Sequence, residues 1–326
     1  MNNKIGGYIS MIIGCFLYSL VPVSVKKYDV SLIYKLILIY VAIYIPSNII
    51  LLYYNKTNKE SEKFTILDLF KDYNRLTVGL LYSVYTFFIF YGFQTIPISI
   101  SLPIFMLAPI FIMFQSKYIN NISFNIYQLI GSIISFIGVI IICYSKSKVN
   151  RSILLKGIIS VLIASFSYSL SFVLLDTNGD RKIFKYFAYE EKKDKEKRKD
   201  LELLHIQMIN TSFIPIIIGI FISIIFKFLP NKYIPIPFHK KKDNITDIIK
   251  LFLIYIILGY ITALCYFFGF NNLSINEYGA IENVEILMSL LVGYFILKEN
   301  ISLQKIIGCI VLILGIISNI YFKNLI

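Results

Sequence analysis

The residues best suited to chemistry in this chain are two glutamates inside an apolar stretch near its C-terminus. Tyr278, Glu282, Glu285 and Ser289 are spaced by four, three and four residues, so on one helix they would share a face. Two carboxylates this close in poorly solvated surroundings resist ionising together, which suits the binding of a proton or of a cationic group. The alternative is a structural pair, held by a lysine or by polar side chains of neighbouring helices.

One basic side chain, Lys35, lies at the start of the second apolar stretch. It is about 6 Å inside that stretch at a rise of ~1.5 Å per residue, so it either extends to the membrane surface or points inward. Pointing inward, it would form an anion site or a partner for the two glutamates. A phosphate-bearing solute would need more than one such cation, so the sequence favours a neutral or cationic solute.

Two tyrosine-serine pairs add aromatic and hydroxyl groups. Tyr18 with Ser19, and Tyr168 with Ser169, occupy equivalent positions of a segment that reads GYISMIIGCFLYSLVPV and recurs 150 residues later as GIISVLIASFSYSLSFV. Nine of these seventeen positions are identical. Such side chains can hold a planar or amphipathic ligand, and plain packing is the other interpretation.

Enzymatic chemistry has little support in the sequence. The two histidines are His205 and His239, and no HExxH, GxSxG or phosphate-binding loop occurs. An intramembrane hydrolase that brings His205 to Glu282 and Glu285 is the remaining catalytic hypothesis. The four cysteines have no metal-ligand spacing, so we predict no metal, no cofactor and no enzyme.

The composition predicts that a membrane surrounds these residues. Hydrophobic residues make up 57% of the 326 residues, and the mean hydropathy is +0.72, which a soluble domain could not hide from water. Ten continuous apolar segments have roughly the ~20 residues that cross a ~30 Å hydrocarbon layer. They cover residues 5–25, 31–54, 76–94, 98–116, 125–144, 153–175, 205–228, 248–271, 275–297 and 303–322. Continuous runs without alternation predict helices, hence an all-α integral membrane protein.

The net charge of +13 does not indicate a nucleic-acid partner, because the basic residues lie mostly in loops. The densest run, residues 191–202, mixes both signs and is typical of a solvated linker. We expect a small-molecule solute and membrane lipid as partners. The oligomeric state stays open, a homodimer included.

Glycines repeat along the later segments. At a spacing of 177 residues, Gly131 and Gly138 fall on Gly308 and Gly315, and the motif FYGF of the third segment falls on FFGF of the eighth. Seven residues turn a helix by about 700°, so each glycine pair lies nearly on one face. Small residues on one stripe let helices approach closely in lipid, so we interpret all four glycines as packing residues.

The duplication divides the chain into residues 1–150 and 151–326, each with five predicted transmembrane helices. Because five is odd, the second half enters the membrane from the opposite side, which predicts two inverted five-helix repeats. In the fourth segment Pro103 and Pro109 remove backbone hydrogen bonds and predict a hinge or a broken helix. Basic residues divide almost evenly between the two sides, so the assignment of both termini to the cytosol rests on a small difference.

Three longer motifs carry a family resemblance: FYGFQTIPIS from residue 90, LAPIF from residue 107 and GYFILKENISLQKIIG from residue 293. With them the chain resembles the drug/metabolite transporter superfamily, and within it the EamA-like branch, over nearly its whole length. The resemblance implies ten helices, cytosolic termini and a central cavity lined by helices 1 to 4 and 6 to 9.

The resemblance also bears on single residues. It implies a structural role for Glu299, which lies at a helix boundary nine residues before Gly308, whereas the first half has Ile122 at the equivalent position. Lys35 looks like the counterpart of a basic residue that the family often carries in its second helix. Substrates in the family range from amino acids to nucleotide sugars and drugs, so the likeness names no solute.

The sequence therefore predicts a secondary active transporter that moves a small organic metabolite or drug by alternating access. Proton coupling through Glu282 and Glu285 is a further hypothesis. The alternatives are a non-transporting membrane scaffold or receptor with the same fold, and the intramembrane hydrolase. A bundle packed solid at its centre would favour the scaffold.

Overall fold

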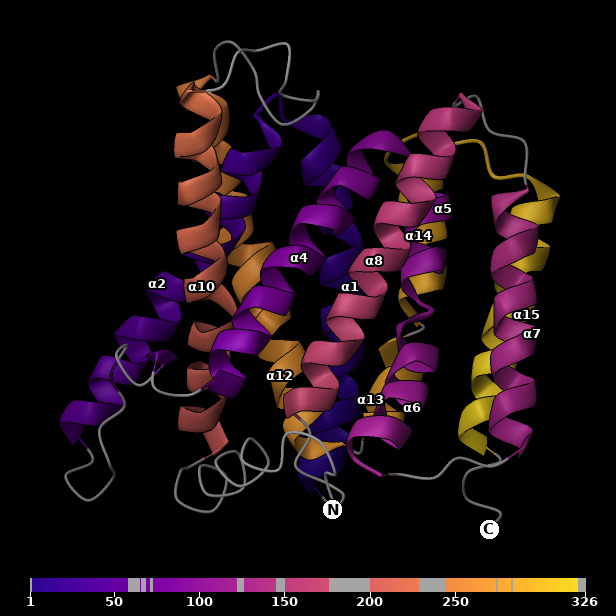
Figure 1. Ribbon diagram of the computed structural model, residues 1–326, viewed down its shortest axis with the longest axis horizontal. Coiled ribbons are helices and arrows are strands. Elements are labelled where there is room, and N and C mark those ends of the chain that lie inside the picture. Colours follow the sequence, from indigo (N-terminus) through magenta and orange to yellow (C-terminus); the bar gives the residue numbers. More distant parts are fainter. Residues whose placement is uncertain are drawn as a thin grey trace.

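A computed structural model gives the architecture of the chain (Figure 1). It describes residues 2–57, 65, 69–70, 73–121, 126–144, 150–175, 200–228, 244–273, 275–282 and 284–321. Ile122, His239 and most of the charged run at 191–202 lie outside the described residues. Within the described residues all regular secondary structure is helical.

The helices follow the predicted apolar segments, and each predicted segment contains one helix or a series of shorter ones. In chain order they are α1 (Asn2–Lys27), α2 (Leu32–Thr57), α4 (Tyr73–Thr95), α5 (Ile98–Phe105), α6 (Ala108–Ile119), α7 (Ile126–Cys143), α8 (Arg151–Leu175), α10 (Asp200–Phe228), α11 (Ile245–Tyr255), the π-helix η2 (Ile256–Ile261), α12 (Thr262–Asn272), α13 (Ile275–Glu282), α14 (Val284–Phe295) and α15 (Leu303–Tyr321).

Seven helical stretches of the described chain are long and apolar enough to cross a membrane. They are Lys4–Lys27, Leu32–Lys56, Arg75–Thr95, Ile98–Ile119, Arg151–Leu175, Glu202–Ile225 and Ile245–Asn272. Three shorter apolar helices, Leu129–Cys143, Val284–Phe295 and Leu303–Gly315, accompany them. The predicted class, an all-helical multi-pass membrane protein, is confirmed.

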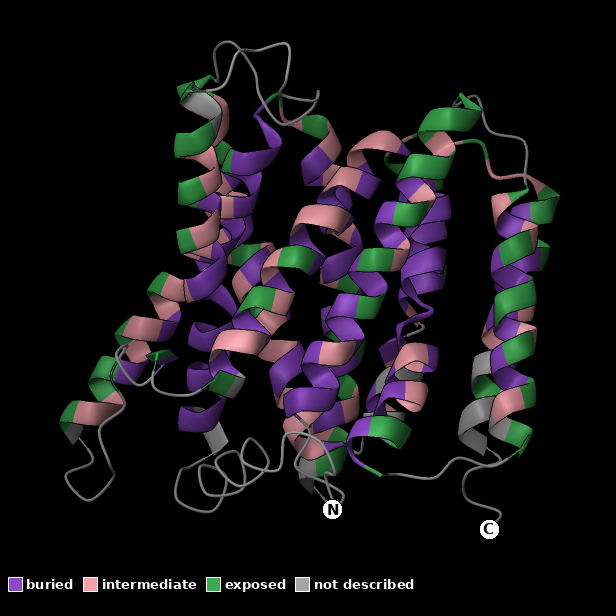
Figure 2. Cartoon of the chain, viewed as in Figure 1, coloured by how far each residue is buried: buried purple, intermediate pink, exposed green. Residues whose placement is uncertain are grey.

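The outer surface of the bundle is apolar. On α7 and α15 the side chains of Ile133, Phe136, Ile310 and Leu314 are each about half exposed. Figure 2 shows exposed positions along the outer faces of these two helices and buried positions where α4 and α8 face each other. An apolar surface of this extent suits lipid tails rather than water.

Helices α7 and α15 pack against each other through their glycines, beside the rest of the bundle (Figure 1). A Cβ atom at Gly138 would lie 2.7 Å from the carbonyl oxygen of Gly308, and one at Gly315 would lie 2.6 Å from that of Gly131. Because the earlier glycine of each helix meets the later glycine of the other, the two helices run antiparallel. Such a close approach of backbones is what small residues permit in lipid.

Glycines also join α4 to α8 and α1 to α12. The side chains that a Cβ would meet are Val161 for Gly92, Ile96 for Gly157, Leu273 for Gly7 and Met11 for Gly269. A larger residue at any of these glycines would push the paired helices apart.

One of the membrane segments is interrupted. It leaves the helix at Met106 and Leu107, between α5 and α6, with Pro103 inside α5 and Pro109 in the first turn of α6. The hinge role of these prolines stays a prediction. The ninth predicted segment contains α13 and α14, and the residue between them, Asn283, lies outside the described residues.

Candidate functional site

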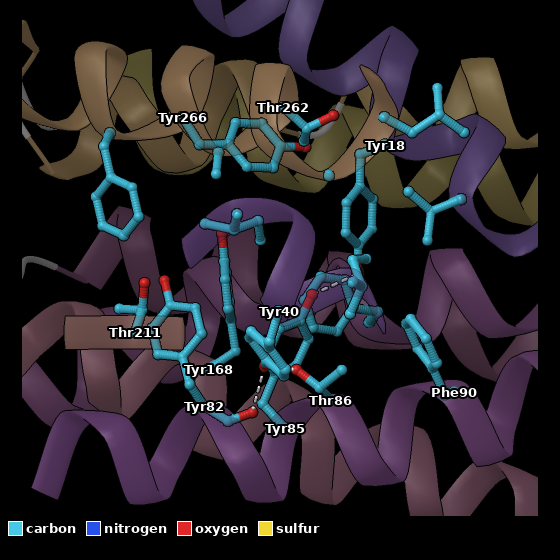
Figure 3. Close-up of a pocket in the computed structure, with 18 of the residues that line it drawn as sticks. Tyr18, Tyr40, Tyr82, Tyr85, Thr86, Phe90, Tyr168, Thr211, Thr262 and Tyr266 are labelled. Carbon is cyan, nitrogen blue, oxygen red and sulfur yellow. Dashed lines mark hydrogen bonds between the residues drawn. The ribbon is translucent and has the colours of Figure 1, made fainter. Parts of the chain in front are cut away.

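A cavity lies between α1, α2, α4, α8, α10 and the η2–α12 stretch (Figure 3). Its empty space, the open mouth included, amounts to about 720 Å³. Its hydroxyl-bearing residues are Tyr18, Tyr40, Tyr82, Tyr85, Tyr168, Tyr266, Thr86, Thr211 and Thr262. Four phenylalanines and several aliphatic residues complete the walls, and none of the described lining residues is charged.

Aromatic rings form a continuous wall around Tyr168. Its ring centroid lies 4.6 Å from that of Phe172, 5.0 Å from that of Tyr85 and 5.1 Å from that of Phe105. All three pairs are tilted, which is a favourable arrangement for aromatic rings. Side chains from three separate membrane segments thus hold Tyr168 in place beside the cavity.

Glu282 and Glu285 do not line the cavity, but they bond to two tyrosines that do. The hydroxyl of Tyr168 donates to Oε1 of Glu282 at 2.6 Å, and that of Tyr266 donates to Oε2 of Glu285 at 3.0 Å. Both carboxylates are buried, at 0% and 1% exposure. Among the described residues, Oε2 of Glu282 and Oε1 of Glu285 have no hydrogen-bond partner. The two carboxylates therefore lie directly behind the tyrosine wall.

Both carboxylates belong to the ninth predicted membrane segment. Glu282 lies in α13 and Glu285 lies in α14.

Further polar groups surround Glu282 from other helices. The hydroxyl oxygens of Tyr278 and Tyr168 are 3.0 Å apart, so a hydrogen-bonded chain runs from Tyr278 to the carboxylate. From α1, the thiol of Cys15 lies 3.9 Å from the backbone carbonyl of Glu282. Of the predicted site residues, Tyr278, Glu282, Glu285 and Tyr168 are thus brought together, and Tyr18 lines the same cavity.

Three of the predicted hydroxyls are used elsewhere. Ser19, Ser169 and Ser289 are buried and are absent from the lining of the cavity. They donate to the backbone carbonyls of Phe16, Phe166 and Ile286, three residues earlier on their own helices. A serine hydroxyl satisfied by its own helix is less available to a ligand.

Lys35 points into the protein and is 1% exposed. Its ammonium donates to the backbone carbonyl of Val25, at the end of α1, at 2.6 Å. The ion pairs that the structure describes join Lys4 to Glu277 and Lys26 to Glu299, so neither Glu282 nor Glu285 forms a described ion pair.

Sequence reasoning missed most of the tyrosine wall. Tyr82 and Tyr85 are three residues apart on α4, and Thr262 and Tyr266 are four apart on α12, so each pair shares a helical face. This helical spacing was the feature of the sequence that could have identified them. With 25 tyrosines in the chain, the spacing alone could not separate these pairs from tyrosines elsewhere.

The histidine required by the hydrolase hypothesis lies elsewhere. Nε2 of His205, on α10, is 3.2 Å from the hydroxyl of Tyr260 in η2. The hydrogen-bond partners of Glu282 and Glu285 are tyrosines instead. The geometry therefore gives this hypothesis no support.

A second polar cluster surrounds Glu299, between α14 and α15. Its Oε1 accepts from the N–H of Ile98 at 2.8 Å and from the ammonium of Lys26 at 3.1 Å. Its Oε2 accepts from the N–H of Ser99 at 3.0 Å and from the Ser99 hydroxyl at 2.7 Å. Glu299 thus caps the N-terminus of α5, which has no side-chain cap of its own. A left-handed turn at Lys298, with φ of 55°, directs it there.

Comparisons with known proteins agree with these features. A family model described as "EamA-like transporter family" matches residues 5–144 and 201–321. A protein of Archaeoglobus fulgidus named "Uncharacterized transporter" is 25% identical over 229 residues. That match covers 68% of this chain and 66% of the relative, so the chain spans slightly less than two thirds of the relative's length. A crystal structure of another protein shares the fold, with a TM-score of 0.60 at 12% identity over 96% of this chain and 97% of the other.

Proposed function

The chain belongs to the EamA-like transporter family, and we propose that it is a secondary active carrier. It moves a small organic metabolite or drug across a membrane by alternating access around the tyrosine-lined cavity. The family match over most of the chain and the name of the archaeal relative support a transport activity. A central cavity also favours a carrier over a scaffold or receptor, for which a solid bundle is expected.

The proposed carrier has ten crossings in two inverted halves, and the glycine contacts support this arrangement. Gly131 corresponds to Gly308 and Gly138 to Gly315, at a spacing of 177 residues. If each glycine is replaced by its counterpart in the other half, the contact of Gly138 with Gly308 becomes a contact of Gly315 with Gly131. That is the second contact observed between α7 and α15.

The same exchange applies to the other glycine-mediated helix pairs. It turns Gly92 with Val161 into Gly269 with Met11, and Gly157 with Ile96 into Gly7 with Leu273. All of these contacts are present. A two-fold axis between the halves, 1–150 and 151–326, would produce contacts that exchange in this way. The antiparallel packing of α7 and α15 supports an axis that runs across them, as proposed for inverted repeats. This is the observation that carries the proposal.

The helices follow the same repeat. At a spacing of 177 residues, α5 (Ile98–Phe105) corresponds to α13 (Ile275–Glu282). Phe105 and Ala108 occupy the positions that correspond to Glu282 and Glu285, so the paired carboxylates belong to the second half alone.

Proton coupling through Glu282 and Glu285 is part of the proposal. A buried carboxylate is costly unless its charge is offset, and each of these keeps one oxygen without a partner. A proton in one state of the carrier and a cationic or neutral solute in another would relieve that cost in turn. The alternation would link solute movement to proton movement.

Transport in reconstituted vesicles tests the proposal. We expect exchange of a labelled solute from a panel of amines, amides and amino alcohols, and its accumulation when a proton gradient is imposed. Glu282→Gln or Glu285→Gln should abolish the accumulation driven by the gradient while exchange remains. As a control, Glu277→Gln alters a carboxylate outside the cavity, paired with Lys4, and should behave as wild type.

Two results would count against different parts of the proposal. If transport by both Glu282→Gln and Glu285→Gln depended on pH as wild-type transport does, the carboxylates would have no role in proton coupling. Folded protein that exchanges no solute of the panel, whatever the gradient, would overturn the carrier function itself.

A further inference from the structure

We propose that the cavity binds an organic cation, whose charged group lies against the rings of Tyr168 and Tyr266. The inference rests on the proposed carrier function and narrows its solute class. Three features carry it: the aromatic walls, the carboxylates behind them, and a threonine hydroxyl that a π-helical turn leaves without a partner.

The walls favour a cation over an anion. Six tyrosines and four phenylalanines line the cavity, and none of its described lining residues is basic or acidic. The face of an aromatic ring is electron-rich and attracts an organic ammonium group. Around Tyr168 three neighbouring ring centroids lie 4.6 to 5.1 Å away, so several aromatic rings are grouped at this part of the cavity. An anion would find no positive group there to balance it.

The carboxylates act on the cavity through the tyrosines. A phenol that donates its hydrogen bond to a carboxylate gains electron density on its ring, which strengthens the attraction for a cation. Tyr168 donates to Glu282 and Tyr266 donates to Glu285, and both tyrosines line the cavity. Glu282 and Glu285 are therefore positioning residues, whose charge reaches the ligand through one aromatic ring.

Charge balance points the same way. Both glutamates are buried, and the ion pairs described in the structure join other residues. Each also keeps one carboxylate oxygen without a hydrogen bond. A cation held at the tyrosine rings would offset this buried negative charge, whereas an anion would add to it.

Thr262 supplies a hydrogen-bonding group at the same wall. Hydroxyls inside helices usually bond to a carbonyl of the preceding turn, as Thr211 does on α10 with the carbonyl of Gln207 at 3.0 Å. Thr262 follows the π-helix η2, whose wider turn displaces those carbonyls, and its Oγ1 has no partner. The residue is 4% exposed and lines the cavity four residues before Tyr266 (Figure 3). A ligand hydrogen bond would satisfy it.

Binding to the full-length protein in detergent tests the ligand class with matched probes. The cation 1-methylnicotinamide, neutral nicotinamide and anionic nicotinate share one flat ring, and benzyltrimethylammonium is a second cation without a hydrogen-bonding group. We expect 1-methylnicotinamide to bind about tenfold more tightly than nicotinamide, and nicotinate more weakly still. Nicotinamide or nicotinate binding as tightly as the cation would overturn the proposal, as would a failure of both cations to bind.

Variants separate the three features. Tyr168→Phe and Glu282→Gln should each lower the preference for the cation over nicotinamide about threefold or more, because the first removes the hydrogen bond to the carboxylate and the second removes the negative charge of its acceptor. Thr262→Val should weaken both nicotinamide-type ligands alike, spare benzyltrimethylammonium, and be rescued by Thr262→Ser. Tyr8→Phe is the matched control, since Tyr8 donates to Glu277 at 2.9 Å outside the cavity.

The outcomes of these variants are decisive even where one fails to fold, because Tyr168→Phe and Glu282→Gln report on the same preference. An unchanged preference in the folded variants, or an equal loss in Tyr8→Phe, would overturn the role of the tyrosine–carboxylate bonds. An equal loss of benzyltrimethylammonium binding in Thr262→Val would overturn the hydrogen-bonding role of Thr262.

Measurement of solute transport in vesicles, beside ligand binding, distinguishes a failure of the cation site from a failure of the carrier function. Cations that bind selectively but never cross reconstituted vesicles would overturn the carrier and leave the ligand class standing. Vesicles that carry a neutral or anionic solute, from protein that binds neither cation, would overturn the ligand class and leave the carrier standing.

Discussion

Single carboxylates in this protein differ in what surrounds them. Both oxygens of Glu299 accept hydrogen bonds, whereas Glu282 and Glu285 each keep one oxygen without a partner. A fully paired buried carboxylate stabilises one packing of its neighbours. An incompletely paired one indicates a proton, an ion or a ligand as the missing partner. Substitution of Glu299 should therefore change the stability of the fold, whereas substitution of Glu282 or Glu285 should change the binding of a proton or a ligand.

Glu299→Gln should destabilise the protein by about 1–3 kcal/mol, because it removes the charge that Lys26 and two backbone N–H groups share. A lowered midpoint of thermal unfolding in detergent at neutral pH would report this loss. Glu277→Gln is the control, since its pair with Lys4 is 53% and 28% exposed and should contribute at most about 1 kcal/mol. Equal effects of the two variants would contradict the capping role.

The same variant has a pH signature. Burial raises the pKa of Glu299. The charge of Lys26 and the hydrogen bonds from Ser99 and Ile98 lower the pKa, and together they outweigh burial, so it lies below its ordinary value of 4.5. A carboxyl with a lowered pKa stabilises the fold above the pKa of the unfolded chain, and this contribution is lost as pH falls through the folded pKa. The difference in unfolding midpoint between wild type and Glu299→Gln should thus shrink below pH 4.5. A constant difference would disprove the assignment.

At the scale of elements, the glycine contact of α7 with α15 makes a symmetric prediction. An alanine Cβ at Gly138 or at Gly315 would lie 2.7 or 2.6 Å from a facing carbonyl oxygen, which backbone atoms cannot yield easily. Gly138→Ala and Gly315→Ala should therefore each destabilise the protein, by about 1–3 kcal/mol and to a similar extent. Thermal unfolding in detergent measures both.

Gly6→Ala is the control for this pair, because the nearest atom to its Cβ would be the ring edge of Phe268 at 3.4 Å. It should leave the unfolding midpoint unchanged. Strongly unequal effects of Gly138→Ala and Gly315→Ala would argue against equivalent environments in the two halves.

The helices and the carboxylates could be predicted because their signals are local. Each membrane helix is a continuous apolar run, and Glu282 and Glu285 stand out as charges inside one. The interruption at Met106 and Leu107 also has a local signal, because Pro103 and Pro109 each remove a backbone hydrogen bond.

The cavity could be predicted only in part, because it forms between helices far apart in the sequence. Tyr18 and Tyr168 stood out through the repeat, whereas Tyr40 and Tyr266 have no such mark. Lys35 was a candidate by its charge and by the family resemblance, yet its ammonium bonds to a backbone carbonyl. Long-range packing decides which polar side chains reach the cavity, and a single sequence does not record it.

For the whole molecule, a symmetric framework carries asymmetric chemistry. The glycine contacts exchange between the halves, while Glu282, Glu285 and Glu299 all belong to the second half. Their counterparts in the first half, Phe105, Ala108 and Ile122, are apolar. In the proposed arrangement the repeat would supply a two-fold framework, and the second half supplies the acidic groups on which proton coupling and cation binding would depend.

The inverted arrangement makes a prediction about topology. With five crossings in each half, Asn150, which precedes α8, should lie on the side of the membrane opposite to both ends of the chain. In Figure 1 the start of α1 and the end of α15 lie at the same end of the bundle.

Replacing Cys15, Cys143, Cys265 and Cys309 by alanine gives a background for single-cysteine labelling with a membrane-impermeant maleimide in intact cells. We expect Asn150→Cys to react on one side, and cysteines added at Lys4 and at the C-terminus to react only when the opposite side is exposed by permeabilisation. Labelling of all three from the same side would require an even number of crossings in the first half, and inverted repeats would then be excluded.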